Sequence, residues 1–394
     1  MDLTIYPGKL SGRIKAIPSK SQAHRLLICA AFSDTDTTLE CPQTNEDIEA
    51  TAHCLNALGA HITRINTGYH IEPIKSTPDS ASMDCGESGS TLRFLLPIVC
   101  ALGTKTTIYM HGRLPYRPLS PLWEELERMG AVLTRPTKTT IQTCGRLHSG
   151  NYTINGNVSS QFISGLLFAT SLLEGNSTIH ISGKTESKPY IDMTQLSLKI
   201  FGVNTENYQV TGSYPFHSPG NLSVEGDWSN AAFFLAAKVL YNLVEVDNLN
   251  PYSPQGDRAI SDLLMLCDST PIIDATDIPD LVPILAVTFG ALKGATFTGI
   301  SRLRLKESDR VASVCNMLNN LGAKAHATEN TLTITPGKYH SCTIDSVGDH
   351  RIAMAAAIAA TVADGPITIL GAECVAKSYP TFWDEYKKLG GRYE

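Results

Sequence analysis

The sequence predicts an α/β (α+β) protein built from six related units of about 70 residues each. Three recurring patterns support this prediction. Polar helix starts lead into apolar runs, amphipathic stretches end at a glycine, and short segments between them alternate in hydrophobicity as strands do. Because a chain of 394 residues normally forms two domains, we expect the units to fold as two groups of three.

The first pattern is a polar or small cluster followed by an apolar run of helical length. The clusters are centred on Ser19, Glu87, Ser159, Asp227, Pro279 and Asp349. Successive centres lie 68, 72, 68, 52 and 70 residues apart. The similarity of these intervals argues against chance spacing in a generic α/β protein. We therefore expect a helix after each cluster.

The second pattern is an amphipathic helix that closes on a glycine. It covers 51–62, 122–133, 196–205, 314–325 and 382–391, and 259–270 is a degenerate sixth copy. A glycine after the last periodic residue suits the left-handed conformation that ends many helices.

The third pattern is a short alternating segment that ends near Gly, Asn or Asp, as strands do. The predicted strands lie within 106–112, 151–157, 177–183, 221–227, 295–301, 331–337 and 366–372.

Composition excludes several classes of protein. The net charge of −6 argues against a protein that binds nucleic acid or a membrane surface. No apolar run reaches the roughly 20 residues of a transmembrane helix, and the N-terminus lacks the pattern of a signal or transit peptide. The ten cysteines form no CxxC pair, which indicates reduced thiols and a cytoplasmic location.

The stretch "PSKSQAHR" suggests what the helix starts do. Ser19 or Ser21 is expected to cap a helix, Lys20 to stand just outside it, and Arg25 to lie one turn on from Ser21. A helix N-terminus offers unpaired N–H groups and the positive end of the dipole, so it binds anions. These groups are predicted to converge on one anion.

Other helix starts repeat this design. Arg93 follows Gly89 by four residues, Ser159, Ser160 and Gln161 supply hydroxyl and amide groups, and Asp349 and His350 precede Arg351. Loops add the cations Arg117, Lys188, Lys306, Arg310 and Lys377 and the acids Asp47, Asp280, Glu307 and Asp309. Any one of these residues is ordinarily a cap or a solvated charge. Together, in an acidic protein, they predict one cleft for a substrate with several negative charges.

Motifs along nearly the whole chain carry a resemblance to a known family. They are "PSKSQAHR", "CGESGSTLR", "RPLSPLWEELERMGA", "SSQFISGLL", "SKPYIDMT", "VEGDWSNAAFFLAA", "IPDLVPILA", "LRLKESDR", "GDHRIAMA" and "AKSYPTFW". In this order they resemble the 5-enolpyruvylshikimate-3-phosphate synthase (3-phosphoshikimate 1-carboxyvinyltransferase) family. "SKPY" combined with "KESDR", "DHR" and "AKSYP" is the most specific part.

The resemblance implies a fold and a reaction. The fold is a two-domain inside-out α/β barrel of six βαβαββ repeats, three per domain, with helix N-termini facing the interdomain cleft. One domain would hold 1–17 and 225–394, and the other 18–224. The reaction transfers the enolpyruvyl group of phosphoenolpyruvate to the 5-hydroxyl of shikimate 3-phosphate and releases phosphate. It uses no metal or organic cofactor, and the implied partners are these two small molecules, with no nucleic acid or membrane and a monomeric enzyme.

The resemblance also assigns residues by motif. Shikimate 3-phosphate is expected to contact Lys20, Ser21, Arg25, Ser159, Ser160, Gln161, Ser187, Tyr190, Asp280 and Lys306. Phosphoenolpyruvate is expected to contact Lys20, Gly89, Arg93, Arg117, Gln161, Arg310, Arg351 and Lys377. Both substrates carry anionic groups, so several Arg and Lys must offset their mutual repulsion.

The chemistry asks for a base and an acid at close range, because the hydroxyl loses a proton while C3 of phosphoenolpyruvate gains one. We expect Asp280 to act as the base, and Glu307 with Lys20 to donate or relay the proton at C3.

Two positions depart from the family pattern. His24 stands where the family usually has Asn, and Glu87 stands where the glycine-rich loop usually has Asn. Glu87 brings an acid close to the expected phosphoenolpyruvate site.

The sequence also disfavours three alternatives. A UDP-N-acetylglucosamine enolpyruvyl transferase would carry a catalytic Cys where this chain has Gly112, and Cys100 reads as a core residue of an apolar helix. A non-catalytic phosphometabolite-binding protein could lose the acid–base residues, yet Asp280, Glu307 and Lys20 are all present. A generic nucleotide-binding enzyme is disfavoured because the chain has no GxxxxGK[ST] motif and no strand-linked GxGxxG motif.

Overall fold

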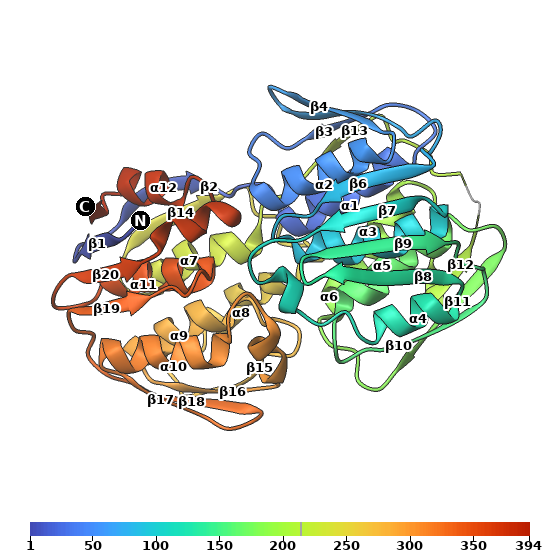
Figure 1. The fold of residues 1–394 in the computed structure, drawn as a ribbon. Helices are drawn as coiled ribbons and strands as arrows, with labels where there is room; N and C mark the ends of the chain where they lie inside the picture. Colours follow the sequence, from blue (N-terminus) through green and yellow to red (C-terminus); the bar gives the residue numbers. More distant parts are fainter. Residues whose placement is uncertain (213–214) are drawn as a thin grey trace. The chain divides into compact units, whose positions relative to one another are not determined.

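The structure, a computed structural model, describes residues 1–212 and 215–394 (Figure 1). The chain divides into two compact units. Unit 1 comprises Met1–Ile17 and Glu225–Glu394, and unit 2 comprises Pro18–Val224. Each unit encloses a hydrophobic core of its own.

Unit 2 contains three sheets among the residues described. The first runs β13 (Asn221–Ser223), β3 (Thr37–Glu40), β5 (Gly68–Glu72), β4 (His61–Ile65). The second runs β6 (Ser80–Asp84), β7 (Lys105–Tyr109), β9 (Thr140–Gly145), β8 (Ala131–Thr137). The third runs β10 (Asn151–Asn155), β11 (Asn176–Ser182), β12 (Gln209–Thr211).

The helices of unit 2 alternate between the two predicted kinds. They are α1 (Lys20–Ala31), α2 (Glu46–Ala57), α3 (Gly89–Leu102), α4 (Leu122–Arg128), α5 (Ser160–Ser171) and α6 (Lys188–Ile200). Two short 3-10 segments, η1 (Leu114–Tyr116) and η2 (Glu206–Tyr208), lie in connections.

Unit 1 repeats the plan. Its first sheet runs β19 (Cys342–Asp345), β20 (Ile367–Leu370), β1 (Leu3–Tyr6), β21 (Arg392–Tyr393). Its second sheet runs β15 (Ile272–Asp274), β16 (Ala295–Thr298), β18 (Thr331–Thr335), β17 (Lys324–Ala327). A further pair consists of β14 (Leu243–Asp247) and β2 (Ser11–Lys15).

The helices of unit 1 are α7 (Trp228–Val239), α8 (Ile260–Leu264), α9 (Val282–Ala291), α10 (Arg310–Leu321), α11 (His350–Ala360) and α12 (Phe382–Lys388). Its 3-10 segments are η3 (Gly256–Ala259), η4 (Ser301–Leu305) and η5 (Ala372–Lys377).

Four sheets contain a parallel pair joined through a buried helix. The pairs are β6 with β7 through α3, β10 with β11 through α5, β15 with β16 through α9, and β19 with β20 through α11. The remaining parallel pairs join segments far apart in sequence, since β13 pairs with β3 and β14 with β2. In each unit, therefore, one parallel pair joins strands that are far apart in the sequence of that unit.

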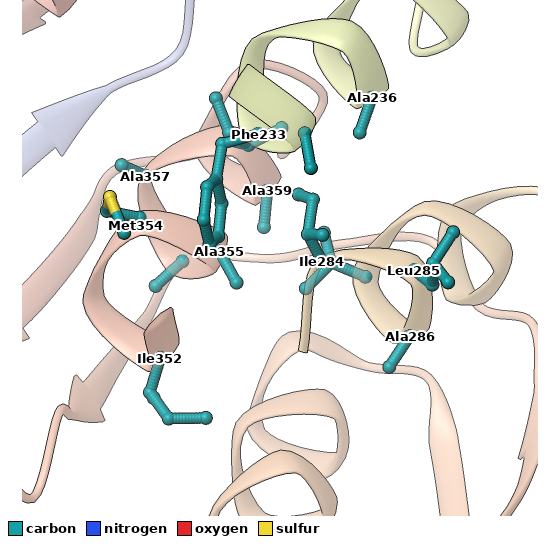
Figure 2. Packing of buried hydrophobic residues seen from close by; sticks show 14 of the residues in the cluster. Phe233, Ala236, Ile284, Leu285, Ala286, Ile352, Met354, Ala355, Ala357 and Ala359 are labelled. Carbon is teal, nitrogen blue, oxygen red and sulfur yellow. The ribbon is translucent and has the colours of Figure 1, made fainter. Parts of the chain in front are cut away.

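The apolar helices form the centre of each unit. In unit 1, α7, α9 and α11 contact one another in pairs and are buried almost all round. Figure 2 shows side chains of these three helices, among them Phe233, Ile284 and Ala355, packed together. Helices inside and sheets outside give the predicted inside-out arrangement. Within the residues described, no helix is both long and apolar enough to cross a membrane.

The predicted helix ends are confirmed. The glycines that follow α2, α4, α6, α10 and α12 all have positive φ, at Gly59, Gly130, Gly202, Gly322 and Gly390. The sixth amphipathic copy, which lacks that glycine, shrinks to the five residues of α8. All seven predicted strands are present, as β7, β10, β11, β13, β16, β18 and β20.

A helix follows each of the six predicted clusters, and Ser19, one of the two expected caps, caps α1. The side chains of Ser88, Ser159, Asp227 and Asp349 cap α3, α5, α7 and α11. The start of α9 has no side-chain cap. Lys20, expected just outside its helix, is the first residue of α1.

Candidate active site

The predicted site residues divide between the two units. Unit 2 holds Lys20, Ser21, Arg25, Gly89, Arg93, Arg117, Ser159, Ser160, Gln161, Ser187 and Tyr190. Unit 1 holds Asp280, Lys306, Glu307, Arg310, Arg351 and Lys377. In both groups the residues come from helix starts or from the loops that precede them.

Lys20 is paired at the first turn of α1. Its Nζ lies 2.9 Å from Oδ2 of Asp47, which belongs to the first turn of α2. The two side chains are only 17% and 10% exposed, so the charge is held in place. An ammonium group has three N–H bonds, so a lysine can contact more than one anionic group.

Arg25 is a buried anchor between α1 and α6. Its Nε donates to Oγ1 of Thr194 at 2.7 Å, and its two Nη atoms donate to the carbonyls of Ser21 and Tyr190 at 2.6 and 2.8 Å. The guanidinium carbon lies 4.9 Å from the centre of the Phe94 ring. Burial lowers the pKa of Arg25 to about 10, so it remains a cation at neutral pH. This arginine fixes the start of α1 against the start of α6.

A second group surrounds Gly89 at the start of α3. A Cβ atom on Gly89 would lie 2.7 Å from Nη1 of Arg117 and 3.0 Å from Nη1 of Arg93. The absence of a side chain at Gly89 thus leaves space in which two guanidinium groups approach the helix start. Arg93 donates to Oε1 of Gln161 at 2.8 Å, and Gln161 donates to Oγ of Ser90 at 2.9 Å. The starts of α3 and α5 are thus joined through polar groups.

The serines of unit 2 lie at helix starts. Ser159 and Ser160 begin α5 and are nearly buried, and Oγ of Ser159 accepts a hydrogen bond from the backbone of Gln161. Ser187 caps α6 in the left-handed conformation with φ of 54°, which turns the chain sharply into the helix. Tyr190 lies in the first turn of α6 and accepts from Arg25.

In unit 1 the group is organised around Asp280. Its carboxylate accepts from Nη1 of Arg310 at 2.5 Å and from Nη2 of Arg351 at 3.2 Å, and Nζ of Lys306 lies 3.5 Å away. Burial alone would raise the pKa of Asp280, but the cations outweigh it and hold that pKa well below its usual range. Asp280 is therefore an ionised carboxylate among cations.

Arg310 links the acids of this group. It is 1% exposed, and it donates from Nη2 to Glu307 at 2.6 Å and from Nε to Asp349 at 2.8 Å. Burial opposes its charge, yet the surrounding carboxylates raise the pKa of Arg310 well above its usual value. Asp349 also caps α11, so one arginine connects the starts of α10 and α11.

Lys306 and Lys377 complete the unit 1 group. Burial lowers the pKa of Lys306 to about 8, against the opposing effect of Asp280. Lys377 ends η5, which contacts α11. The next residue, Ser378, is hydrogen-bonded to Asn230 of α7, which ties the lysine's loop to the core.

Three acids that were not expected to contact substrate lie among these residues. Asp47 pairs with Lys20, Asp349 holds Arg310, and Asp257 is a fully buried carboxyl that accepts from Ser229. Burial, with the charge of Asp280, raises the pKa of Asp257 to about 6. Asp47 and Asp349 could be found as acids at helix starts, but Asp257 gave no comparable signal.

No group of three or more His, Cys, Asp or Glu side chains within residues 1–212 and 215–394 is arranged to hold a metal ion. The side chains around Asp280 are instead arranged as ion pairs. A carboxylate held among three cations, with a second carboxylate on the same arginine, is suited to proton transfer beside an anionic substrate.

Known proteins similar to this chain agree with one another. The family model described as EPSP synthase (3-phosphoshikimate 1-carboxyvinyltransferase) matches residues 5–386. The curated 3-phosphoshikimate 1-carboxyvinyltransferase of Clostridium beijerinckii is 38% identical over all of this chain and 98% of its own length. That of Clostridium acetobutylicum is 39% identical over 98% of this chain and 97% of its own length.

Solved structures show the same likeness. The EPSP synthase of Acinetobacter baumannii superimposes with a TM-score of 0.81 and 25% identity, covering all of this chain and 99% of its own. The enolpyruvyl transferase NikO of Streptomyces tendae, at 15% identity and a TM-score of 0.78 over all of this chain and 98% of its own, shares the fold.

Proposed function

The chain belongs to the EPSP synthase family, and we propose that it carries out the family's reaction at one site to which both units contribute. The carboxyvinyl group of phosphoenolpyruvate is transferred to the 5-hydroxyl of shikimate 3-phosphate, and phosphate is released. This is a step of aromatic amino-acid biosynthesis. The observation that carries the proposal is that Asp280 and Glu307 both pair with one buried arginine, Arg310.

Asp280 is proposed as the base at the 5-hydroxyl. In the unliganded protein the neighbouring cations make it a weak base, since they hold its pKa low. Two substrates with phosphate and carboxylate groups would draw Arg351 and Lys306 into contacts of their own. The negative charge that they bring raises the proton affinity of Asp280 when the hydroxyl proton must leave.

Glu307 and Lys20 are proposed to handle the proton at C3. As the 5-oxygen bonds to C2 of phosphoenolpyruvate, the hydroxyl proton goes to Asp280 and C3 takes a proton from Glu307 or Lys20. When the bond between C2 and the phosphate oxygen breaks, C3 returns its proton, and the phosphate leaves with the proton that Asp280 took from the hydroxyl. Glu307 is 19% exposed and lies against Arg310, which stabilises its anionic form between the two steps.

The remaining residues are proposed to hold the substrates. The residues proposed to contact shikimate 3-phosphate are Lys20, Ser21, Arg25, Ser159, Ser160, Gln161, Ser187, Tyr190, Asp280 and Lys306. Those proposed to contact phosphoenolpyruvate are Lys20, Gly89, Arg93, Arg117, Gln161, Arg310, Arg351 and Lys377. The support is that Gly89, Arg93, Arg117 and Gln161 lie together in unit 2, and that Asp280, Lys306, Arg310 and Arg351 lie together in unit 1.

One contact adds to the case against the sibling transferase. The carboxylate of Glu87 lies against Gly112, where a Cβ atom would come within 2.6 Å of three of its atoms. Gly112 also has φ of 52°. A cysteine at this position would have a strained backbone and would displace the carboxylate of Glu87.

We further propose that the enzyme is a cytoplasmic monomer. The ten cysteines, all of which lie in the part of the chain described, are free thiols, as expected in a reducing compartment. Sedimentation of the purified protein tests the monomer.

A single assay tests the function. Phosphate release is measured with phosphoenolpyruvate and shikimate 3-phosphate, and then with UDP-N-acetylglucosamine as the acceptor. We expect turnover with the first acceptor and none with the second. No release with shikimate 3-phosphate from folded protein would overturn the proposal, and release with the second acceptor alone would assign the sibling reaction.

A further inference from the structure

His24 is a buried residue of α1 that the proposed reaction does not use. It is 0% exposed and follows Lys20 by one helical turn. Its ring meets Phe94 edge-on with the ring centres 6.4 Å apart, and the same Phe94 ring contacts the guanidinium of Arg25. A polar ring in such a place needs hydrogen-bond partners, because burying an unpaired polar group is costly.

A chain of buried hydroxyl groups begins at this ring. Nδ1 of His24 lies 2.7 Å from Oγ1 of Thr51 on α2. Oγ1 of Thr51 lies 2.6 Å from Oγ1 of Thr91 on α3. Thr91 donates to Oγ of Ser88, the cap of α3, at 2.7 Å. The chain therefore joins α1, α2 and α3 near the starts that carry Lys20, Asp47 and Gly89.

Counting protons fixes the direction of each bond. The single hydroxyl proton of Thr91 goes to Ser88, and the other nearby acceptor, the carbonyl of Asp47 at 3.4 Å, cannot donate. Thr51 must therefore donate to Thr91. Its own proton is then used, so the bond between His24 and Thr51 requires Nδ1–H of the histidine as the donor.

This direction also determines the protonation state of the other ring nitrogen, Nε2. Nε2 is left as an acceptor, and it has no hydrogen-bond partner among the residues described. Burial lowers the pKa of His24 to about 3; Asp47 opposes this, while Lys20 and Arg25 add to it. The histidine is therefore neutral at physiological pH, with its proton on Nδ1.

We infer that His24 is a positioning residue, which donates a hydrogen bond from Nδ1 into the Thr51–Thr91–Ser88 chain. This chain fixes the starts of α1, α2 and α3 relative to one another. The effect on Lys20 and on the loop before Gly89 rests on the proposed function. The histidine itself touches no substrate. The inference also explains how histidine can stand where the family usually has Asn, since the Nδ2 atom of an Asn side chain occupies nearly the position of Nδ1.

The first test reads the tautomer directly and needs no activity. The protein is labelled with ¹⁵N-histidine, and the signals of His24 are assigned by their loss in His24→Asn. We expect a protonated Nδ1 and an unprotonated Nε2 whose shifts do not change between pH 5 and 8. A proton on Nε2, or an imidazolium that titrates above pH 5, would overturn the inference.

The second test asks whether the chain positions the site. Thr51→Val keeps the side-chain shape and removes the acceptor, so kcat/KM per folded enzyme is expected to fall about tenfold. The matched control is Thr170→Val in α5 of the same unit, whose buried hydroxyl bonds only to carbonyls of its own helix. Equal kcat/KM in the two variants would contradict a positioning role.

Substitutions of His24 separate the hydrogen bond from the bulk of the ring. His24→Asn is expected to stay within about twofold of the unaltered protein, because it keeps the donor, and His24→Leu to lose about as much as Thr51→Val. An Asn variant as impaired as the Leu variant would refute the role of Nδ1. If the tautomer is found but the unaltered protein has no transferase activity, the proposed function fails and the hydrogen-bonded chain stands.

Discussion

At the scale of single residues, the site is a set of charges that balance one another before substrate arrives. Asp280 and Glu307 share Arg310, and Asp280 also contacts Arg351. Such pairs contribute little net stability, because burying both charges costs about as much as their attraction returns. We propose that they keep the cations oriented for anionic substrates, which would replace the carboxylates as partners.

Glu307→Gln tests the acid–base role. The amide fills the same space but cannot give or hold a proton, so kcat is expected to fall about 10²–10⁴-fold. The affinities for both substrates, measured by calorimetry, should change little. Glu245→Gln is the control, since Glu245 is an exposed glutamate of the same unit that also pairs with an arginine. Unchanged turnover in Glu307→Gln would remove this residue from the chemistry.

The pKa of Lys306 predicts how activity declines at alkaline pH. Because its folded pKa is about 8, the side chain is a cation below that pH and becomes neutral above it. The value of kcat/KM for shikimate 3-phosphate reports the free enzyme and is expected to decline above about pH 8. Lys306→Arg keeps its charge at higher pH, so the decline should move upward. A decline at the same pH in both proteins would assign it to another group.

At the scale of elements, the helix starts show what could be predicted and what could not. The apolar runs and the closing glycines depend on local sequence, so both kinds of helix were predicted. The caps were less regular. Leu281 occupies the cap position of α9 and has no side-chain acceptor, while Asp280, one residue earlier, is bound to Arg310 and Arg351. A local pattern does not reveal such contacts with distant residues.

The strands show the same limit. The predicted strands alternate because one face of each is buried. β2, by contrast, has a single buried residue among its five, so it shows no alternation to recognise. β21 has only two residues. The motif-based site residues were named by family resemblance, whereas Asp257 shows its importance only through burial beside Ser229 and Asp280.

Gly165 tests how closely α5 must approach α3. A Cβ atom there would lie 2.2 Å from the carbonyl oxygen of Arg93 and 3.1 Å from Pro97. Gly165→Ala is expected to destabilise the protein by about 1–3 kcal/mol despite the better helix propensity of alanine. It should also raise the KM for phosphoenolpyruvate, because Arg93 and Gln161 bridge these helices.

The measurements are the midpoint of denaturant unfolding and the steady-state kinetics. Gly8→Ala is the control, since nothing lies within 4 Å of the added methyl group. An unfolding midpoint for Gly165→Ala equal to that of the control would show that the two helices can separate without penalty.

At the scale of the whole molecule, the chain passes from one unit to the other twice, near Ile17 and near Val224. Each unit uses strands from distant parts of the sequence, as the pairs β13 with β3 and β14 with β2 show. The helix starts that carry the site residues therefore belong to two separately cored bodies. The central claim is that one substrate, shikimate 3-phosphate, is held by residues of both.

Two matched variants test this claim most directly. Lys20 in unit 2 and Lys306 in unit 1 are both partly buried and each faces an aspartate, Asp47 and Asp280 respectively. The binding of shikimate 3-phosphate to Lys20→Met and to Lys306→Met is measured by calorimetry, with exposed Lys388→Met as the control and circular dichroism to confirm folding. We expect each site variant to weaken binding about tenfold or more, and the control to leave it unchanged. Weakening in only one of the two would show that a single unit holds the substrate, and would contradict the claim.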